Sequence, residues 1–299
     1  MPYDRGMVVA IGAMVLRSVP PEQVVAQARE LAPHVDEIWV VEDLPFAGGV
    51  SQAGSVLEAT KDLPRPPLVG HGIAPAPFRN PAALAMEWAT LARMHPGRFH
   101  GGIGHGVPEW MAQIGSNKAS PLGLLAETIT STRALLRGQT VTVDGRYVHL
   151  DGISLQFPPD PPPMVSAGVA GPRSLAVAGR TADGTILSEG SGPADVETAW
   201  RHIETGRAEA QANGEAMVGP HRLTVFAGYY CGDLSVLPPR PEHLPPGWDA
   251  VGSEPAVVAA LLQSLVDAGA ESIVLVPFGP DVASQIELAA TEIVPDLTR

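Results

Sequence analysis

The sequence predicts a single α/β domain over residues 1–299, a (β/α)8 TIM barrel, and two observations lead to this prediction. First, eight short apolar runs are each followed by a stretch with helical periodicity, and these units occupy nearly all of the 299 residues. Second, the runs are apolar throughout instead of alternating, which is typical of parallel strands covered on both faces. A doubly wound sheet is the alternative fold.

Strands and helices are expected to alternate along the chain. The first helix illustrates the pattern, because Val24, Ala28 and Leu31 share one helix face and Pro21 stands at an early helical position. The strands are expected at Met7–Val15, Ile38–Val41, Leu68–Ile73, Phe99–Ile103, Met164–Ala167, Thr185–Leu187, Leu223–Tyr230 and Ser272–Val276. The helices that follow them are expected at Pro21–Leu31, Val50–Thr60, Pro81–Met94, Leu122–Leu136, Pro172–Ala178, Ala194–Ala212, Pro255–Ala268 and Val282–Ile293.

Two stretches depart from the repeating unit. Thr140–Leu150 reads as a hairpin around the turn dipeptide Asp144-Gly145, inserted before the fifth strand and expected at the bottom of the barrel. Cys231–Ser253 is a long proline-rich loop after the seventh strand. Long loops in compact domains are usually functional, and this one is expected on the catalytic face.

Composition excludes several classes of protein. The lone cysteine, Cys231, cannot form an intrachain disulfide or a cysteine zinc site. The first residues lack the pattern of a signal peptide, and no run of about 18 apolar residues is present. A formal net charge of −13 opposes binding to nucleic acid or to an anionic membrane. We therefore expect a cytoplasmic protein that acts on a small-molecule substrate, with no nucleic acid and no membrane as partner.

In this fold the active site lies at the C-terminal ends of the strands, so the polar residues that follow the apolar runs are candidates for it. They are Arg17, Glu42, Asp43, His71, His105, Glu109, Ser166, Ser188 and Glu189. The nine histidines are scattered without metal-ligand spacing, so no metal is expected. A metal shared by His71, His105 and Asp43 is the less favoured alternative.

Two glycine-rich segments add candidates for ligand binding. Gly101–Gly106 (GGIGHG) closes the fourth strand, and glycine there lets the backbone of Gly104, His105 and Gly106 approach a flat ligand closely. Tight packing of the strand is the alternative. Gly168–Ser174 (GVAGPRS) places a glycine turn before a helix, where free N–H groups and the helix dipole form an anion site. Its members are Gly168, Val169, Ala170, Gly171 and Arg173, whose charge would add to the site; an ordinary turn is the alternative.

At these motifs the sequence resembles the luciferase-like monooxygenases and their deazaflavin-dependent relatives. The resemblance lies in Asp36–Asp43 (DEIWVVED), Val69–Asn80 (VGHGIAPAPFRN), Pro96–Gly115 (PGRFHGGIGHGVPEWMAQIG) and Val165–Leu187 (VSAGVAGPRSLAVAGRTADGTIL). The likeness extends over nearly the whole chain, and these segments occur in the same order as in the family.

The resemblance implies a barrel that binds FMN or coenzyme F420 at the strand C-termini. In the methanopterin-reductase branch the third strand ends in a bulge like Gly70-His71-Gly72-Ile73, which presses on the central ring of the cofactor. The resemblance thus implies cofactor contacts from these four residues, with a cis peptide bond between Gly72 and Ile73. Ser166 is likewise expected to contact the cofactor, and His71 and His105 to face the cofactor or the substrate. The resemblance also implies a phosphate site near Gly168–Arg173 and places Asp43 near the deazaflavin ring edge. One departure is that Leu44 follows Asp43, where the sugar-phosphate dehydrogenase branch has a catalytic histidine. A homodimer is expected from the family alone.

Three functional hypotheses follow. The first is a coenzyme F420-dependent oxidoreductase that transfers a hydride to or from a C=C, C=N or C=O bond, with His105, His71 or Glu109 as the proton-transferring residue. The second is an FMN-dependent monooxygenase supplied by a partner flavin reductase. The third is a barrel that binds a ligand without catalysis. The substrate has no decodable motif.

Overall fold

The strands of the computed structural model, which describes residues 9–215, 219–237 and 247–297, close into a barrel. The sheet runs in the order β10-β9-β11-β1-β2-β3-β4-β7-β8, and β8 pairs in turn with β9. All pairs in this sheet are parallel. The TIM-barrel prediction is therefore confirmed, and the closing β8–β9 pair excludes an open doubly wound sheet.

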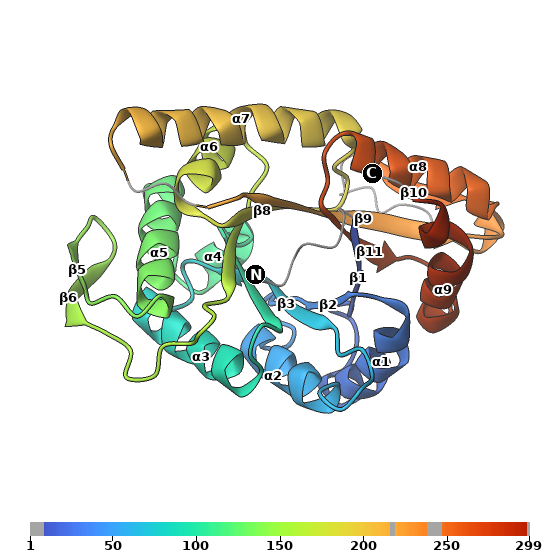
Figure 1. Ribbon diagram of the computed structural model, residues 1–299, viewed down its shortest axis with the longest axis horizontal. Helices are drawn as coiled ribbons and strands as arrows, with labels where there is room; N and C mark the ends of the chain where they lie inside the picture. The colour runs from blue at the N-terminus through green and yellow to red at the C-terminus, as the bar shows by residue number, and fades with distance from the viewer. Residues whose placement is uncertain (1–8, 216–218, 238–246, 298–299) are drawn as a thin grey trace.

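Each barrel strand is followed by a helix, and Figure 1 shows the helices arranged around the central strands. The strands are β1 (Ala10–Met14), β2 (Glu37–Val40), β3 (Leu68–Pro75), β4 (Phe99–Gly104), β7 (Met164–Gly168), β8 (Gly184–Leu187), β9 (Arg222–Cys231) and β11 (Ser272–Pro277). The helices around them are α1 (Val24–Leu31), α2 (Gly49–Ala59), α3 (Pro81–Met94), α5 (Pro121–Leu136), α6 (Pro172–Thr181), α7 (Pro193–Ala212), α8 (Pro255–Asp267) and α9 (Val282–Leu288).

The barrel interior is filled below the strand ends. An inner apolar cluster is formed by Met14, Trp39, Ile186, Phe226, Val274 and Val276. Beneath it, where the strands begin, Glu37 accepts hydrogen bonds from Trp39 Nε1 (2.8 Å) and Ser272 Oγ (3.0 Å) and forms an ion pair with Arg222. Because these side chains occupy the lower barrel, a ligand has room only toward the opposite, C-terminal end.

The predicted hairpin is present as β5 (Val141–Asp144) and β6 (His149–Ile153), which pair antiparallel. It lies beside α5 and not beneath the barrel, as Figure 1 shows, which corrects its expected position. Glu127 of α5 accepts the backbone N–H groups of the turn, and Tyr147 Oη accepts the N–H of Ser120 (2.7 Å). These contacts fold the hairpin back along its own preceding helix.

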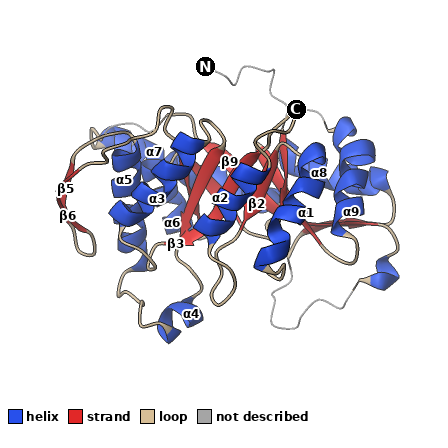
Figure 2. Ribbon diagram, turned by 90° about the horizontal axis from the view of Figure 1, so that it is seen from below, coloured by secondary structure: helices blue, strands red, loops and turns tan. Residues whose placement is uncertain are grey.

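The long loop after the seventh strand contains structure that the sequence did not indicate. Residues 238–246 lie outside the described residues, and after them β10 (Asp249–Gly252) pairs with the end of β9. A further helix, α4 (Pro108–Gln113), follows β4 and projects beyond the barrel (Figure 2). Within the described residues, no helix has both the length and the apolar character needed to cross a membrane.

Candidate functional site

The mouth of the barrel, which is its open end at the C-termini of the strands, has an apolar floor. Leu16, Val41 and Ile73 stand at or just past the ends of β1, β2 and β3, are partly buried, and pack on the inner apolar cluster. Their exposed parts face the C-terminal ends of the strands, where TIM-barrel sites lie. A flat, partly apolar ligand would find complementary surface here.

Ile73 is part of this floor, and glycines of the neighbouring strands make room for it. The β3–β4 register shifts between His71 and Ala74, and the peptide bond between Gly72 and Ile73 is cis, as the resemblance implied. A Cβ added at Gly168 would lie 2.5 Å from Ile73 Cγ2, and one at Gly104 would lie 2.8 Å from Ile73 Cδ1. The glycines at the strand ends therefore serve close packing of Ile73, which was the alternative reading for Gly104.

Acidic groups and one arginine gather on the rim of the mouth. Asp43 follows β2 and pairs with Arg17 at 3.1 Å. Glu189 follows β8 and is exposed. Desolvation by the surrounding protein raises the pKa of the Glu189 carboxyl, and Asp43 and Asp249 add to this, while Arg17 opposes it.

His105 lies just past the end of β4 and is half-buried. Its Nε2 is 3.1 Å from Ser174 Oγ in the first turn of α6. Burial lowers the pKa of the imidazole, so it is neutral near pH 7. His105 and Gly106 also line a small cavity of about 70 Å³ between β4 and α5, together with Lys118.

The segment before α6 has the features of an anion site. Gly171 is the N-cap of α6 and provides no side-chain cap, and Pro172 opens the helix. Ala170, Gly171 and Arg173 are exposed, whereas Val169 is buried and its N–H donates to Ile186 O at 3.2 Å. The N–H of Val169 is thus already used, and the anion site narrows to the first turn of α6.

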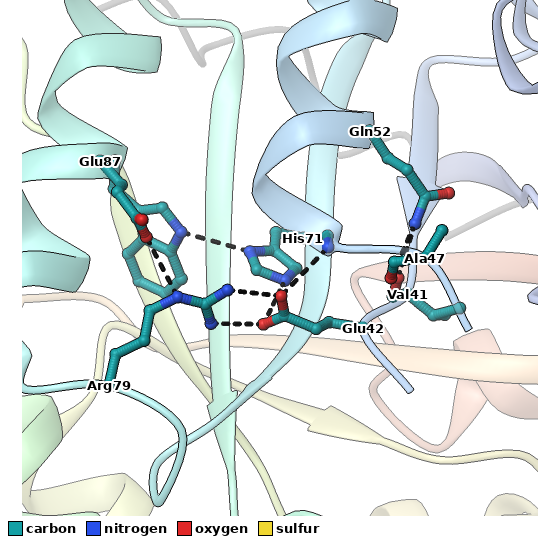
Figure 3. Close-up of polar contacts among 9 residues, drawn as sticks. Val41, Glu42, Ala47, Gln52, His71, Arg79 and Glu87 are labelled. Carbon is teal, nitrogen blue, oxygen red and sulfur yellow. Dashed lines mark hydrogen bonds and ion pairs between the residues drawn. The ribbon is translucent and has the colours of Figure 1, made fainter. Parts of the chain in front are cut away.

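Three predicted site residues do not reach the mouth. His71 is fully buried behind the barrel wall, where Nδ1 accepts from Trp88 Nε1 (3.2 Å) and Nε2 lies 3.5 Å from Glu42 (Figure 3). Ser166 is buried one layer below the mouth and lies 2.7 Å from His100 Nε2. A Cβ at Gly70 would lie 2.1 Å from Trp39, in the filled interior. These positions correct the expectation that His71 faces cofactor or substrate and that Ser166 and Gly70 contact a cofactor.

For two acidic residues the structure changes the role expected from the sequence. Glu109 is exposed in the first turn of α4. Glu189 was a candidate only because it follows an apolar run, and the sequence indicated no catalytic role for it. Among the described residues, no group of three or more His, Cys, Asp or Glu side chains is arranged to hold a metal ion.

The parallel (β/α)8 barrel, with polar groups and an apolar floor at its mouth, has the form of a protein that binds a small molecule at the strand ends. More specifically, residues 7–233 match the family model described as luciferase-like monooxygenase, and the chain belongs to that family. The relatives described below are named as a reductase and a dehydrogenase.

Two curated relatives carry names that refer to F420 or to methanopterin reduction. The chain is 27% identical over 220 residues to a 5,10-methylenetetrahydromethanopterin reductase of Methanolobus tindarius, covering 74% of this chain and 60% of that protein. It is 28% identical over 262 residues to an F420-dependent hydroxymycolic acid dehydrogenase of Mycobacterium tuberculosis, covering 77% and 70%. The alignment thus spans about 60–70% of the length of these relatives.

The fold extends to solved structures. An F420-dependent secondary alcohol dehydrogenase in complex with an F420-acetone adduct superposes with a TM-score of 0.84 at 19% identity, covering 98% of this chain and 100% of that chain. At this identity the likeness shows the fold.

Proposed function

We propose that this chain is a coenzyme F420-dependent oxidoreductase that acts on a small organic substrate with a C=C, C=N or C=O bond. The F420-dependent relative supports this choice of cofactor over FMN. When bound, the deazaflavin supplies or accepts the hydride. The protein's part is to hold the ring and the substrate and to move the proton.

The observation that carries the proposal is the chemistry of the barrel mouth. Its floor of Leu16, Val41 and Ile73 suits a flat ring, and the first turn of α6 suits a phosphate. Arg173 is exposed beside that turn. Because the net charge of −13 opposes an anionic ligand, local N–H groups and arginines must attract it.

Backbone of the strand-end glycines would complete the pocket. Asp43 would stand at the ring edge, with Gly72, Ile73, Gly104 and Gly106 beneath and beside the ring. Gly168, Val169, Ala170, Gly171 and Arg173 would form the phosphate arm, in which the buried Val169 acts through packing and not through its N–H.

His105 and Glu189 are the side chains best suited to move a proton. Their environments change the two pKa values in opposite directions, lowering that of His105 and raising that of Glu189. Such a divergence marks a base and an acid at many active sites. We therefore assign His105 to accept a proton and Glu189 to donate one, with Glu109 as a further candidate because it lies on α4, which follows β4.

A binding experiment tests the cofactor. Purified protein is titrated with F420 and, in parallel, with reduced FMN, followed by fluorescence and by oxygen consumption. Saturable F420 binding with weaker FMN binding supports the proposal. With a substrate series, loss of the deazaflavin absorbance reports oxidation of the substrate by F420, and recovery of that absorbance from reduced F420 reports reduction of the substrate. Tight binding of FMN with oxygen uptake would instead support the monooxygenase. Binding of neither would leave the non-catalytic barrel.

Three expectations stay predictions. The homodimer is tested by sedimentation of the purified protein. A partner flavin reductase is required only by the FMN alternative. The cytoplasmic location is tested by cell fractionation.

A further inference from the structure

A buried polar cluster lies outside the barrel, behind the ends of β2 and β3, and the proposed function leaves it unused. Glu42 follows β2 and is 5% exposed, and His71 in β3 is fully buried. Arg79 stands in the loop before α3 and is 23% exposed. Figure 3 shows these three side chains converging between the strands and helices α2 and α3.

The contacts within this cluster are specific. Arg79 donates to both carboxylate oxygens of Glu42, with Nη1–Oε2 and Nη2–Oε1 distances of 2.6 Å. Such a bidentate pair fixes orientation as well as charge. Gly49 N–H at the start of α2 donates to Glu42 Oε1 (3.1 Å), and Arg79 Nε lies 3.2 Å from Glu87.

The hydrogen bond from Trp88 fixes the tautomer of His71. Because Trp88 Nε1 donates to Nδ1, a neutral His71 carries its proton on Nε2, the atom that faces Glu42. Burial by itself would raise the pKa of Glu42, but Arg79 and His71 outweigh it and lower the value to about 2. Glu42 is therefore a buried carboxylate at every pH of physiological interest.

Two members of the cluster adjoin segments of the proposed site. Glu42 precedes Asp43, and His71 precedes the Gly72-Ile73 bulge. The Gln52 amide of α2 also contacts this region, because it donates to Val41 O (3.1 Å) and Ala47 O (3.3 Å). These two carbonyl groups lie on either side of Asp43 in the loop after β2. The same network thus holds, from behind, both strand ends that reach the mouth.

We propose that Glu42, His71 and Arg79 are positioning residues that fix Asp43 and the Ile73 bulge from outside the barrel, so that these groups meet the cofactor in one arrangement. This inference rests on the proposed function. A buried ion pair is not needed for stability alone, since apolar residues of similar volume often serve as well. The pair lies behind Asp43 and the Ile73 bulge, and this location suits it to hold both segments in place.

The test compares Glu42→Gln with Asp183→Asn. Asp183 is a matched control, because it too is a buried carboxylate that pairs with arginines, Arg133 and Arg137 (2.8 Å each), and accepts a backbone N–H, from Val165. It precedes β8, at the end of the barrel opposite the mouth. Both variants are expected to lower the melting temperature.

Only Glu42→Gln is expected to weaken F420 binding, on the order of tenfold to a hundredfold, because small displacements of site groups have effects of that size. It should also speed amide hydrogen exchange in residues 41–47 and 70–76, which Asp183→Asn should leave unchanged. If Glu42→Gln does not fold, Arg79→Lys keeps the charge, loses the bidentate geometry, and should show the same two effects more weakly.

Equal F420 affinity and unchanged exchange in the two segments, alongside a lowered melting temperature, would overturn the inference and leave the cluster purely structural. Failure of the proposed function looks different, because the unaltered protein would then bind no F420. In that case hydrogen exchange alone decides whether the cluster positions the two strand ends.

Discussion

At the scale of single residues, His105 is the side chain whose removal separates catalysis from binding. His105→Ala is expected to lower turnover at least about tenfold while leaving F420 affinity nearly intact, because a positioned proton carrier acts mainly on the chemical step. Single-turnover kinetics at 420 nm and a binding titration measure the two quantities. His149→Ala, on the exposed hairpin, is the control. Unchanged turnover in His105→Ala would remove this residue from the mechanism.

Two adjacent glycines at the start of α2 give a matched pair for stability. A Cβ at Gly49 would lie 2.1 Å from His71 Nε2 and 2.9 Å from Glu42 Cβ, whereas one at Gly48 meets nothing within 4 Å. Gly49→Ala is expected to destabilise the fold by about 1–3 kcal/mol through overpacking. Gly48→Ala should stay within about 0.5 kcal/mol, measured by denaturant unfolding of both variants. Equal decreases in the free energy of unfolding of the two variants would contradict the crowding at Gly49.

The same residues show where the sequence was insufficient. His71 follows an apolar run and so looked like a rim residue, but its neighbours Gly70 and Gly72 have no side chains to show which face is inside. Only the positions of Trp88 and Glu42 reveal that His71 points away from the mouth. Ser166 was misplaced for a related reason, because it lies inside β7, which continues to Gly168, and not after the end of the strand.

At the scale of elements, the bulge of β3 depends on the neighbouring strands leaving it space. Gly168→Ala would place Cβ 2.5 Å from Ile73 Cγ2, and a Cβ at Gly102 or Gly104 would also approach Ile73 within 3.0 Å. With no room to the side, Ile73 must move toward the mouth, so F420 affinity is expected to fall about tenfold. A fluorescence titration against Gly219→Ala, whose added Cβ meets nothing within 4 Å, checks this. Equal affinity of both variants would show that Ile73 does not floor the pocket.

Elements were predictable where they bury a continuous apolar surface. The eight barrel strands and their helices could be predicted because each buries a continuous apolar run or face. Helix α4 has only 6 residues, too few to establish a period. Strand β10 has 4 residues like β2 and β8, but it is buried at only two of them, whereas β2 and β8 are buried throughout. The hairpin was recognisable from Asp144-Gly145, but its place beside α5 depends on Glu127, which is distant in sequence.

At the scale of the whole molecule, buried neutral histidines couple the fold to pH. Burial is the main cause that lowers the pKa of His100 to about 3 and of His221 to about 4. An unfolded histidine takes up its proton near pH 6.5, so between pH 6.5 and about 4 unfolding binds protons. Stability therefore falls as pH decreases. Lowered pKa values of His95 and His105 act in the same direction, and the raised value of Glu189 opposes them.

The size of this effect follows from the two deepest shifts. Lowering the pH from 8 to 5 is expected to cost about 2 kcal/mol of stability for each of His100 and His221. Melting temperatures across this range measure it. His221→Gln, which keeps a partner for Thr185 Oγ1, should lose part of the slope, whereas His149→Gln on the exposed hairpin should retain all of it. A slope that is the same in both variants would mean that His221 does not stay neutral in the folded protein, and the acid sensitivity would then have to come from other groups.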